Sequence, residues 1–482
     1  MKNRREFMKT VLIGGGALLA APALLRGDTA GVLDPIRGAA SGSDDVWIQV
    51  PRILARIKPP IFPDRDFLIT KYGAVGDNKS DCTEAFAKAV AACHAAGGGR
   101  VVVPAGEFMT GAIRLRSNVN LHVSHGATIR FTRDTKKYPL VFTRWEGMEL
   151  MNFSPFIYAF EEENVAISGK GTIDGYADCD HWWPWKGRLN CGWKKGAPSQ
   201  EKDRNHLMAL VESGAPVSQR VFGEGHFLRP QFIQPYRCKN VLIEDVTLLN
   251  SPMWQVHPVL CTNVTVRRLT ISSFGPNTDG CDPESCTDVH IQDCFFNTGD
   301  DCIAIKSGRN ADGRRLHVPS SNFVIQGCHM KDGHGGVTVG SEISGGVHHV
   351  FAENCRMDSP HLDSAVRIKD NAMRGGLLEH IYVRNIDVGQ VALAGLSIDY
   401  NYEEGDKGNF TPIVRDVEIR NLKTRKADYA LYLRGFKNAP IYDISVVDCD
   451  FEGVAKPNVI ENVKGLSLRN VIINGTRVDK AS

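Results

Sequence analysis

Three features that would point to common protein classes are missing from this sequence: a strong net charge, a Cys-x-x-Cys pair and a long unbroken apolar run. The 482 residues carry a formal net charge of +2 at pH 7, and 23% of them are charged. A nearly neutral chain argues against nucleic acid or an acidic membrane as its main partner. Without Cys-x-x-Cys spacing, a structural zinc site is not expected either.

Cysteine is present, but its number and spacing do not define a disulfide framework. Thirteen is an odd count, so at least one cysteine is unpaired or pairs between chains. The sequence does not decide whether disulfide bridges form between Cys179 and Cys191 or between Cys281 and Cys286. Four others share one position of the repeat described next, which predicts an internal ladder of small buried residues: Cys294, Cys328, Cys355 and Cys449.

A degenerate repeat occupies most of the chain. It has apolar residues at i and i+2, usually Asp or Asn at i+4, Cys, Leu, Ile or Val at i+5, and an apolar residue at i+7. The alternation predicts strands separated by turns, and a strand-sized unit that recurs every 22 to 36 residues is typical of a stacked solenoid. The repeat starts are Val241, Val264, Val289, Phe323, Val350, Ile381, Val417, Ile444 and Leu466, with weaker copies near Val119 and Val165.

Other solenoids and the propeller fit this pattern less well. No strong helical pattern interrupts the repeats, which argues against leucine-rich and helical repeats. A propeller would need several strands in each unit. The sequence therefore predicts an all-β, single-domain, right-handed parallel β-helix, with equivalent positions stacked about 4.8 Å apart. A helix from about Cys82 to Ala96, with Phe86, Val90 and Cys93 on its apolar side, is the expected N-terminal cap.

The chain starts with the features of an export signal. Arg4-Arg5-Glu6-Phe7-Met8-Lys9 precedes a moderately apolar run from Val11 to Leu25, with Ala21-Pro22-Ala23 near its end. This arrangement predicts an export signal over residues 1–27, and the Arg-Arg-x-Phe-x-Lys pattern resembles a bacterial twin-arginine signal. A membrane anchor is the alternative, but the apolar run is short and broken by three glycines. We expect a periplasmic or secreted protein that does not contact the membrane after signal removal.

The rest of the chain divides into an extended, proline-punctuated lead-in over residues 28–66 and the β-helix domain over residues 67–482. An insertion at about 176–235 breaks the repeat, and five of the seven tryptophans fall between residues 145 and 193. A packed surface loop with aromatic anchors is the simpler interpretation of any single tryptophan. Because long insertions in a solenoid often lie on its binding face, we expect the whole insertion to form a wall at one end of a groove.

Four short motifs on consecutive turns carry the candidate functional residues. They are Asn277-Thr278-Asp279-Gly280, Gly299-Asp300-Asp301-Cys302, Gly333-His334-Gly335 and Arg367-Ile368-Lys369. Asp300 and His334 each lie 11 residues after their repeat starts, and the other two motifs have a similar phase. The stacking therefore predicts that the motifs line one groove.

This set of side chains suits glycoside hydrolysis. Like charges held close together raise the pKa of one carboxyl, so one of Asp279, Asp300 and Asp301 can stay protonated and act as an acid. The other two carboxylates can position and activate a water. A separation of about 6.5–9.5 Å between acid and base would lead to inversion of the anomeric configuration. His334 could orient the acid or tune its proton.

Taken alone, each motif has an ordinary explanation. Asn-Thr-Asp-Gly and Gly-His-Gly are common turns, and Asp-Asp could be an Asx turn or part of a calcium site. Arg-Ile-Lys is by default an exposed strand face, although its two cations point to one side and could hold a sugar carboxylate. Together, in this order and phase, the motifs favour a catalytic groove, in which we expect neither a metal nor a cofactor.

The four motifs, in this order, resemble those of glycoside hydrolase family 28, the polygalacturonases. The resemblance extends from Tyr72-Gly-Ala-Val-Gly-Asp77 to the last repeats. It implies hydrolysis of α-1,4 galacturonosyl linkages in a polyanionic galacturonan, the pectin backbone. The implied roles are general acid for Asp300, water activation for Asp279 and Asp301, support of the acid for His334, and binding of the galacturonate carboxylate for Arg367 and Lys369, with Asn277 nearby.

Within this family, the chain resembles the bacterial exo-acting branch. Ser307–Arg315 and Gly225–Pro230 carry the likeness, and Lys306 stands where many endo-acting members have Asn. The histidine of Gly-His-Gly points to homogalacturonan, because rhamnogalacturonan-cleaving relatives lack it. Endo action, or hydrolysis of xylogalacturonan, rhamnogalacturonan or unsaturated galacturonide ends, are the alternatives. A polysaccharide lyase or a non-catalytic carbohydrate-binding β-helix are further alternatives, but the acid cluster followed by Gly-His-Gly favours hydrolysis.

Overall fold

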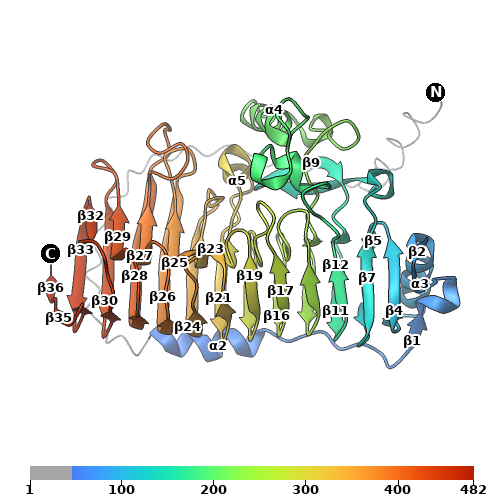
Figure 1. Cartoon of the computed structure of the whole chain (residues 1–482), viewed down its shortest axis with the longest axis horizontal. Coiled ribbons are helices and arrows are strands. Elements are labelled where there is room, and N and C mark those ends of the chain that lie inside the picture. The colour runs from blue at the N-terminus through green and yellow to red at the C-terminus, as the bar shows by residue number, and fades with distance from the viewer. Residues whose placement is uncertain (1–45, 482) are drawn as a thin grey trace, which may run out of the picture. The chain divides into compact units, whose positions relative to one another are not determined.

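Parallel strands stacked turn upon turn form most of the structure, a computed structural model that describes residues 46–481 (Figure 1). The largest sheet has 25 strands, and a separate parallel sheet has six. The fold is a right-handed parallel β-helix, so the predicted fold class is confirmed. The export signal predicted over residues 1–27 falls outside the described residues.

The turns are built from three series of strands. The series that contains the repeat starts comprises β3 (Gly99–Val103), β6 (Val119–Val123), β11 (Glu163–Gly169), β14 (Lys239–Glu244), β16 (Thr262–Arg267), β18 (Thr287–Gln292), β21 (Ser320–Gln326), β24 (Val347–Met357), β26 (Gly376–Val388), β28 (Pro412–Thr424), β30 (Ile441–Val447) and β33 (Val463–Arg469). The second series, in the same sheet, includes β4 (Gly106–Thr110), β7 (Ala127–Phe131), β12 (Thr172–Asp174), β15 (Thr247–Leu249), β17 (Thr270–Ser273), β19 (Phe295–Thr298) and β22 (His329–Met330). The six-stranded sheet is β20 (Ile303–Ile305), β23 (Gly333–Val339), β25 (Leu362–Lys369), β27 (Ala394–Asp399), β29 (Tyr429–Arg434) and β32 (Val459–Glu461).

The register between turns follows the repeat read from the sequence. Each repeat start is paired with the next: Val241 with Val264, Val264 with Val289, and so on through Ile444 with Leu466. The weak copy at Val165 also pairs in register with Val241. The side chains at these starts are buried, so the apolar positions of the alternating pattern are those that point into the coil.

A left-handed backbone residue lies four residues after each repeat start from Val241 onward and explains the polar position of the repeat. The residue at i+4 has a positive φ in every copy from Val241 to Leu466, for example 66° at Asp245, 52° at Asp293 and 53° at Asn470. Asp and Asn tolerate this conformation better than other residues with a Cβ atom. The residue before each start also has a positive φ. At four of these positions, side-chain hydrogen bonds of 2.7–2.9 Å form a ladder of asparagines: Asn118, Asn164, Asn240 and Asn263. The sequence alone does not predict this ladder.

All thirteen cysteines are free thiols. The predicted ladder is confirmed, because Cys294, Cys328, Cys355 and Cys449 are all buried inside the coil. Neither of the two bridges left open by the sequence is formed. Cys286 instead belongs to a second buried stack, in which the Cys238 amide donates to Cys261 Sγ and the Cys261 amide donates to Cys286 Sγ, both at 3.4 Å.

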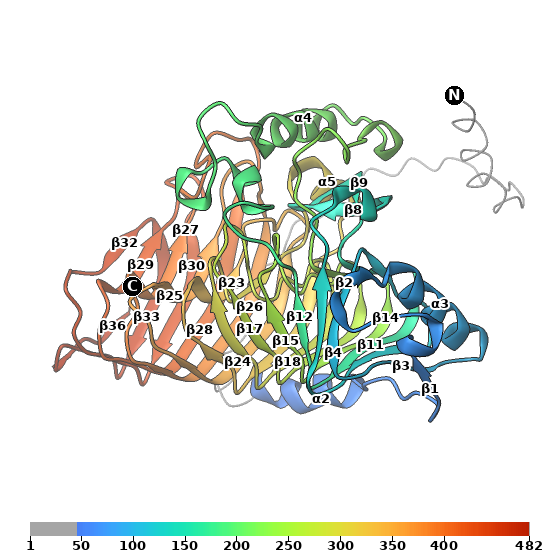
Figure 2. The same ribbon diagram turned by 45° about the vertical axis from the view of Figure 1, so that its right-hand side comes forward.

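Helix α3 (Thr83–Ala95) covers the N-terminal end of the coil (Figures 1 and 2). Phe86, Val90 and Cys93, predicted as its apolar side, are 1%, 3% and 0% exposed. They belong to the same hydrophobic core as the strands of the first turns, including β1 (Asp66–Leu68) and β3. The predicted cap is therefore confirmed.

A second N-terminal helix lies inside the segment that was predicted to be extended. Residues Val46–Ile48 form a 3₁₀ turn, and α2 (Gln49–Arg56) follows it along the outside of the coil (Figure 1). Pro51 lies in the first helical turn, where the backbone amides have no intrahelical acceptor, so it does not break the helix. Ile53 and its apolar neighbours pack against Phe351 and residues of two adjoining strands, which fastens α2 across several turns.

The insertion lies above the middle of the coil (Figures 1 and 2). It contains 3₁₀ turns at Trp183–Lys186, Leu189–Cys191 and Val217–Gln219 and one helix, α4 (Gln200–Glu212). Two further elements beside it escaped the sequence interpretation: an antiparallel hairpin of β8 (Leu140–Trp145) and β9 (Met148–Phe153), and the short helix α5 (Asn310–Leu316). No helix within residues 46–481 has the length and apolar character needed to cross a bilayer.

The packing of α2 predicts a clear difference between two isoleucines of this segment. Ile53 is 2% exposed and Ile48 is 48% exposed. We expect Ile53→Ala to lower the free energy of unfolding by about 2–5 kcal/mol, because it leaves a cavity between α2 and the coil. Ile48→Ala, the matched control, should stay within about 0.5 kcal/mol of the parent protein. Urea unfolding followed by circular dichroism measures both; equal effects would contradict the docking of α2.

Candidate active site

The four motifs lie on neighbouring turns, as predicted. Backbone hydrogen bonds join the Gly280 amide to the Asp301 carbonyl at 2.9 Å and the His334 amide to the Asp300 carbonyl at 3.2 Å. One strand further, Thr338 of β23 pairs in register with Arg367 of β25. This stacking brings together all seven residues singled out from the sequence: Asn277, Asp279, Asp300, Asp301, His334, Arg367 and Lys369.

Asp300 is the most accessible of the three aspartates, with 18% of its side chain exposed. His334 Nδ1 lies 2.8 Å from Asp300 Oδ1, and Asn277 Nδ2 donates to Oδ2 at 3.4 Å. Burial opposes the charge of Asp300, but the hydrogen bond and positive charge of His334 hold its pKa below the usual range. The same hydrogen bond raises the pKa of His334. The two side chains therefore hold one proton between them as an ion pair.

Asp301 is fully buried and is bound by cations from two strands away. Lys369 Nζ donates to Asp301 Oδ2 at 2.5 Å, Thr338 Oγ1 donates to Oδ1 at 3.2 Å, and Arg367 Nη1 lies 3.6 Å from Oδ1. Burial lowers the pKa of Lys369, but its acidic neighbours, first Asp301 and then Tyr402, together raise that pKa overall. Lys369 is thus engaged with the aspartate, whereas Arg367 keeps 17% of its side chain exposed.

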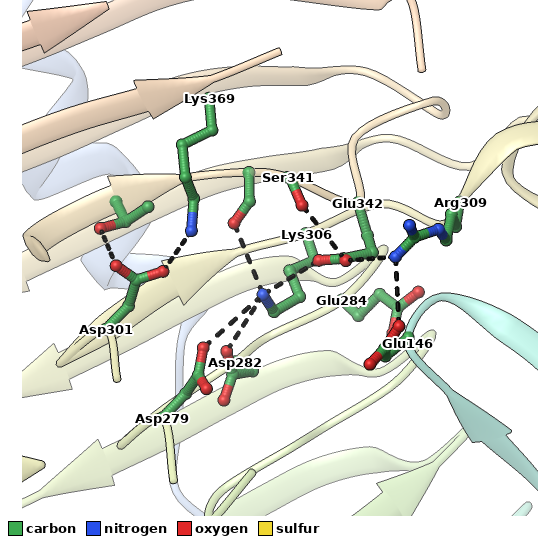
Figure 3. A network of polar contacts seen from close by, with 12 residues as sticks. Glu146, Asp279, Asp282, Glu284, Asp301, Lys306, Arg309, Ser341, Glu342 and Lys369 are labelled. Carbon is green, nitrogen blue, oxygen red and sulfur yellow. Dashed lines mark hydrogen bonds and ion pairs between the residues drawn. The ribbon is translucent and has the colours of Figure 1, made fainter. Parts of the chain in front are cut away.

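Asp279 shares a buried cation with a fourth aspartate (Figure 3). Lys306 Nζ lies 3.8 Å from Asp279 Oδ2, 3.5 Å from Asp282 Oδ1 and 3.1 Å from Glu342 Oε2. Burial raises the pKa of Asp279 well above its usual value, and the charges of Asp282 and Asp300 act in the same direction. Burial also raises the pKa of Asp282 to about 8, although Lys306 opposes the shift. Asp279 and Asp282 therefore retain a proton near neutral pH.

Three residues that hold the site together were not recognised as such from the sequence. Asp282 follows Asp279 by three residues and could have been noticed as part of one extended motif. Glu342 has no motif of its own and is found only from the structure. Arg229, from the segment Gly225–Pro230, donates to Asn277 Oδ1 at 2.8 Å and is itself fully buried, which lowers its pKa to about 10. It fixes the asparagine that contacts Asp300.

A pocket of about 70 Å³ opens beside Asp279 and Asp300. Lys306, Lys369, Trp254 and other coil residues form its floor. Its remaining lining comes from segments outside the regular repeat: Glu146 from the turn between β8 and β9, Lys186 and Arg204 from the insertion, Arg309 from the start of α5, and Tyr402 and Glu403 from the loop after β27. The coil thus supplies the carboxylates, and the inserted segments enclose them.

The carboxylate cluster has the spacing of a possible cation site. The nearest oxygens of Asp279, Asp300 and Asp301 lie within 4.8 Å of one another, so together they could hold a metal ion. However, ammonium groups already neutralise the cluster, since Lys369 binds Asp301 at 2.5 Å and Lys306 lies 3.8 Å from Asp279. An added divalent cation would be repelled by these two lysines. The electrostatics therefore favour proton chemistry over metal binding.

Comparisons with known proteins agree with this geometry. The family described as "Glycosyl hydrolases family 28" matches residues 224–472. A solved exopolygalacturonase from Thermotoga maritima is 43% identical and superposes with a TM-score of 0.87, covering 91% of this chain and 99% of that one. A protein described as "Probable polygalacturonase" from Vitis vinifera is 28% identical over 83% of this chain and 77% of its own length. The exo-poly-alpha-D-galacturonosidase of Dickeya chrysanthemi is 26% identical, over 70% of this chain and 57% of its own length.

The His334–Asp300 pair predicts a titration that can be observed directly. We expect the pKa of His334, followed by NMR, to lie above its usual value near 6.5 and to fall toward it in Asp300→Asn. His329, whose pKa is lowered by burial and by Arg356, should not respond to that substitution. Because the folded pKa of His334 is raised, its stabilising contribution is complete below about pH 6.5 and is lost as pH rises through the folded value. An unshifted His334 would contradict the ion pair.

Proposed function

The chain belongs to glycosyl hydrolase family 28, and from this we propose that it hydrolyses α-1,4 galacturonosyl linkages of the pectin backbone from a chain end. The observation that supports the proposal best is the cluster of Asp279, Asp300 and Asp301, with His334 hydrogen-bonded to Asp300. A polyanionic galacturonan is the substrate class. The similarity of this chain to the exopolygalacturonase of Thermotoga maritima supports the exo mode.

Asp300 is the general acid in this proposal. It is the accessible aspartate of the cluster, and its proton comes from the imidazolium of His334 at 2.8 Å. In the free site the proton lies on His334. A bound uronate brings negative charge and displaces water, and both effects raise the pKa of Asp300. The proton then moves across the existing hydrogen bond to Asp300, which donates it to the departing glycosidic oxygen.

Asp279 and Asp301 position and activate the attacking water. Lys369 Nζ donates to Asp301 Oδ2 at 2.5 Å and so holds this carboxylate in place. In this proposal the proton that Asp279 and Asp282 retain between them passes to Asp282 when substrate binds, which leaves Asp279 as a carboxylate that can activate the water. Arg367, more exposed than Lys369, is the main contact for a substrate carboxylate, while Lys369 acts chiefly on Asp301.

The stereochemical course of the reaction is a separate proposal. Oxygens of the three aspartates lie within 4.8 Å of one another, closer than the separation of about 6.5–9.5 Å in the two-carboxylate scheme for inverting enzymes. That scheme places the two carboxyls on opposite sides of the sugar. Here the acid and the other two carboxylates lie together in one cluster, so that scheme does not apply to their separation. The family resemblance favours inversion, and NMR of the first product anomer tests it.

The pocket supports exo action. Its lining includes Lys186 and Arg204 of the insertion, which lie beside the aspartates where a long polysaccharide would otherwise continue. Arg204 is fixed by a 2.6 Å ion pair to Glu146 of the β8–β9 turn. A wall held in this way limits binding to a chain end. Export to the periplasm or medium through a twin-arginine-type signal over residues 1–27 is proposed from the sequence alone.

The mode of action can be tested with de-esterified polygalacturonate in the presence of EDTA. We expect monomer or dimer to accumulate from the start, no absorbance from unsaturated uronates, and no loss of activity on chelation. A ladder of mid-length oligomers would contradict the exo mode. Ultraviolet-absorbing product would indicate a lyase and remove the acid and base roles of the aspartates. Loss of activity with EDTA would show that the carboxylate cluster holds a cation after all.

The three aspartates can be tested by isosteric substitution. Asp300→Asn, Asp279→Asn and Asp301→Asn should each lower kcat by about 10³-fold or more, because each removes a proton donor or a water-activating charge. Asp293→Asn is the matched control: it is an exposed turn aspartate with a φ of 52°, which Asn also adopts. Circular dichroism checks that the variants are folded. A folded Asp300→Asn variant with parent-like kcat would refute the assignment.

A further inference from the structure

Five cations line the pocket, and one of them differs from the rest. Arg204, Lys306, Arg309 and Lys369 each have an ion pair of 3.3 Å or less: Arg204 with Glu146 at 2.6 Å, Lys306 with Glu342 at 3.1 Å, Arg309 with Glu403 at 3.1 Å, and Lys369 with Asp301 at 2.5 Å. Lys186 lines the same pocket but makes no ion pair or hydrogen bond within the described residues 46–481.

The surroundings of Lys186 do not supply the missing partner. Glu146 is the carboxylate that acts on it most strongly, yet Arg204 and Arg309 already bind Glu146 Oε2 at 2.6 and 3.2 Å. Burial lowers the pKa of Lys186, and the charges of Arg229 and Arg204 lower it further. Keeping an unpaired ammonium among other cations is costly, and an anion entering the pocket would relieve the cost.

Lys186 is held in place by the aromatic residues just before it. It ends the 3₁₀ turn Trp183–Lys186. Trp183 Nε1 donates to the Ser251 carbonyl of the coil at 2.9 Å. Trp182 is 3% exposed and packs against Trp185 with ring centroids 4.9 Å apart. The tryptophans of the insertion are therefore anchors that fasten its cationic end to the coil.

We propose that Lys186 binds the carboxylate of the terminal galacturonate where the insertion lines the pocket, and so makes the enzyme selective for chain ends whose last sugar is a free acid. This inference rests on the proposed function and adds that the terminal sugar must carry a free carboxylate. Arg367 and Lys369 lie on β25, whereas Lys186 comes from the insertion. A terminal sugar contacted by Lys186 is thus recognised by a residue outside the catalytic motifs. A methyl-esterified end would leave the ammonium unpaired.

Two Lys186 variants, one control variant and three substrates test the contact. The substrates are trigalacturonate and trigalacturonates that carry one methyl ester, on either terminal sugar. The parent enzyme should favour the free acid over one of the two esters by about 10- to 100-fold in kcat/KM, the range expected for a buried charge-assisted hydrogen bond. Lys186→Gln should lose that preference, mainly through KM, and Lys186→Arg should keep part of it. Lys195→Gln, an exposed lysine of the same insertion, is the control and should behave like the parent.

The outcomes separate this inference from the proposed function. If the parent enzyme does not cleave trigalacturonate at all, the proposed function fails. If the parent cleaves it but Lys186→Gln keeps the same preference between acid and ester, the function stands and the role of Lys186 is refuted. A uniform loss of activity on all three substrates would show that Lys186 supports the fold of the wall, which also refutes it.

Discussion

The parallel register between successive turns is the constraint on which the site depends. Val264, Val289, Phe323 and Val350 face one another in order, so the motifs that follow them reach the same surface at intervals of about 4.8 Å. A slip of one residue in any turn would send its side chains to the opposite face. From Val241 onward, left-handed residues recur just before each repeat start and four residues after it, and keeping them aligned between turns disfavours such a slip.

Stacking of this kind places like charges close together, and the structure offsets them with cations from later turns. Asp301 is neutralised by Lys369, two strands further along the six-stranded sheet, and Asp279 by Lys306. Buried ion pairs contribute little net stability, because desolvation opposes the attraction. Their benefit here is a set of carboxyls in different protonation states: Asp300 holds its charge against His334, while the pair of Asp279 and Asp282 retains a proton.

How far the sequence predicts the structure depends on whether a segment repeats. The coil, its buried thiol ladder and the four motifs follow from a period of two within strands and from Asp or Asn at left-handed turns. Helix α2 lies where the prolines of residues 28–66 predict an extended segment, because Pro51 falls in the first helical turn and there removes no hydrogen bond. The partnership of Lys369 with Asp301 could not be predicted, because spacing along one strand does not show which neighbouring strand a side chain faces. Glu342 likewise reaches Lys306 only through the stacking of turns.

The inserted segments close the groove, which the repeating coil alone cannot do. Each turn of the coil repeats the same geometry, so a groove along it is open at both ends and binds a polymer at any point. Closing one end requires chain that leaves the repeat, which is where Glu146, Lys186 and Arg204 originate. Since these residues share no strand with the three aspartates, the wall can change without moving the acid and base. Selectivity for chain ends and catalysis therefore depend on different segments of this fold. The unpaired Lys186 belongs to the segment that would select the chain end.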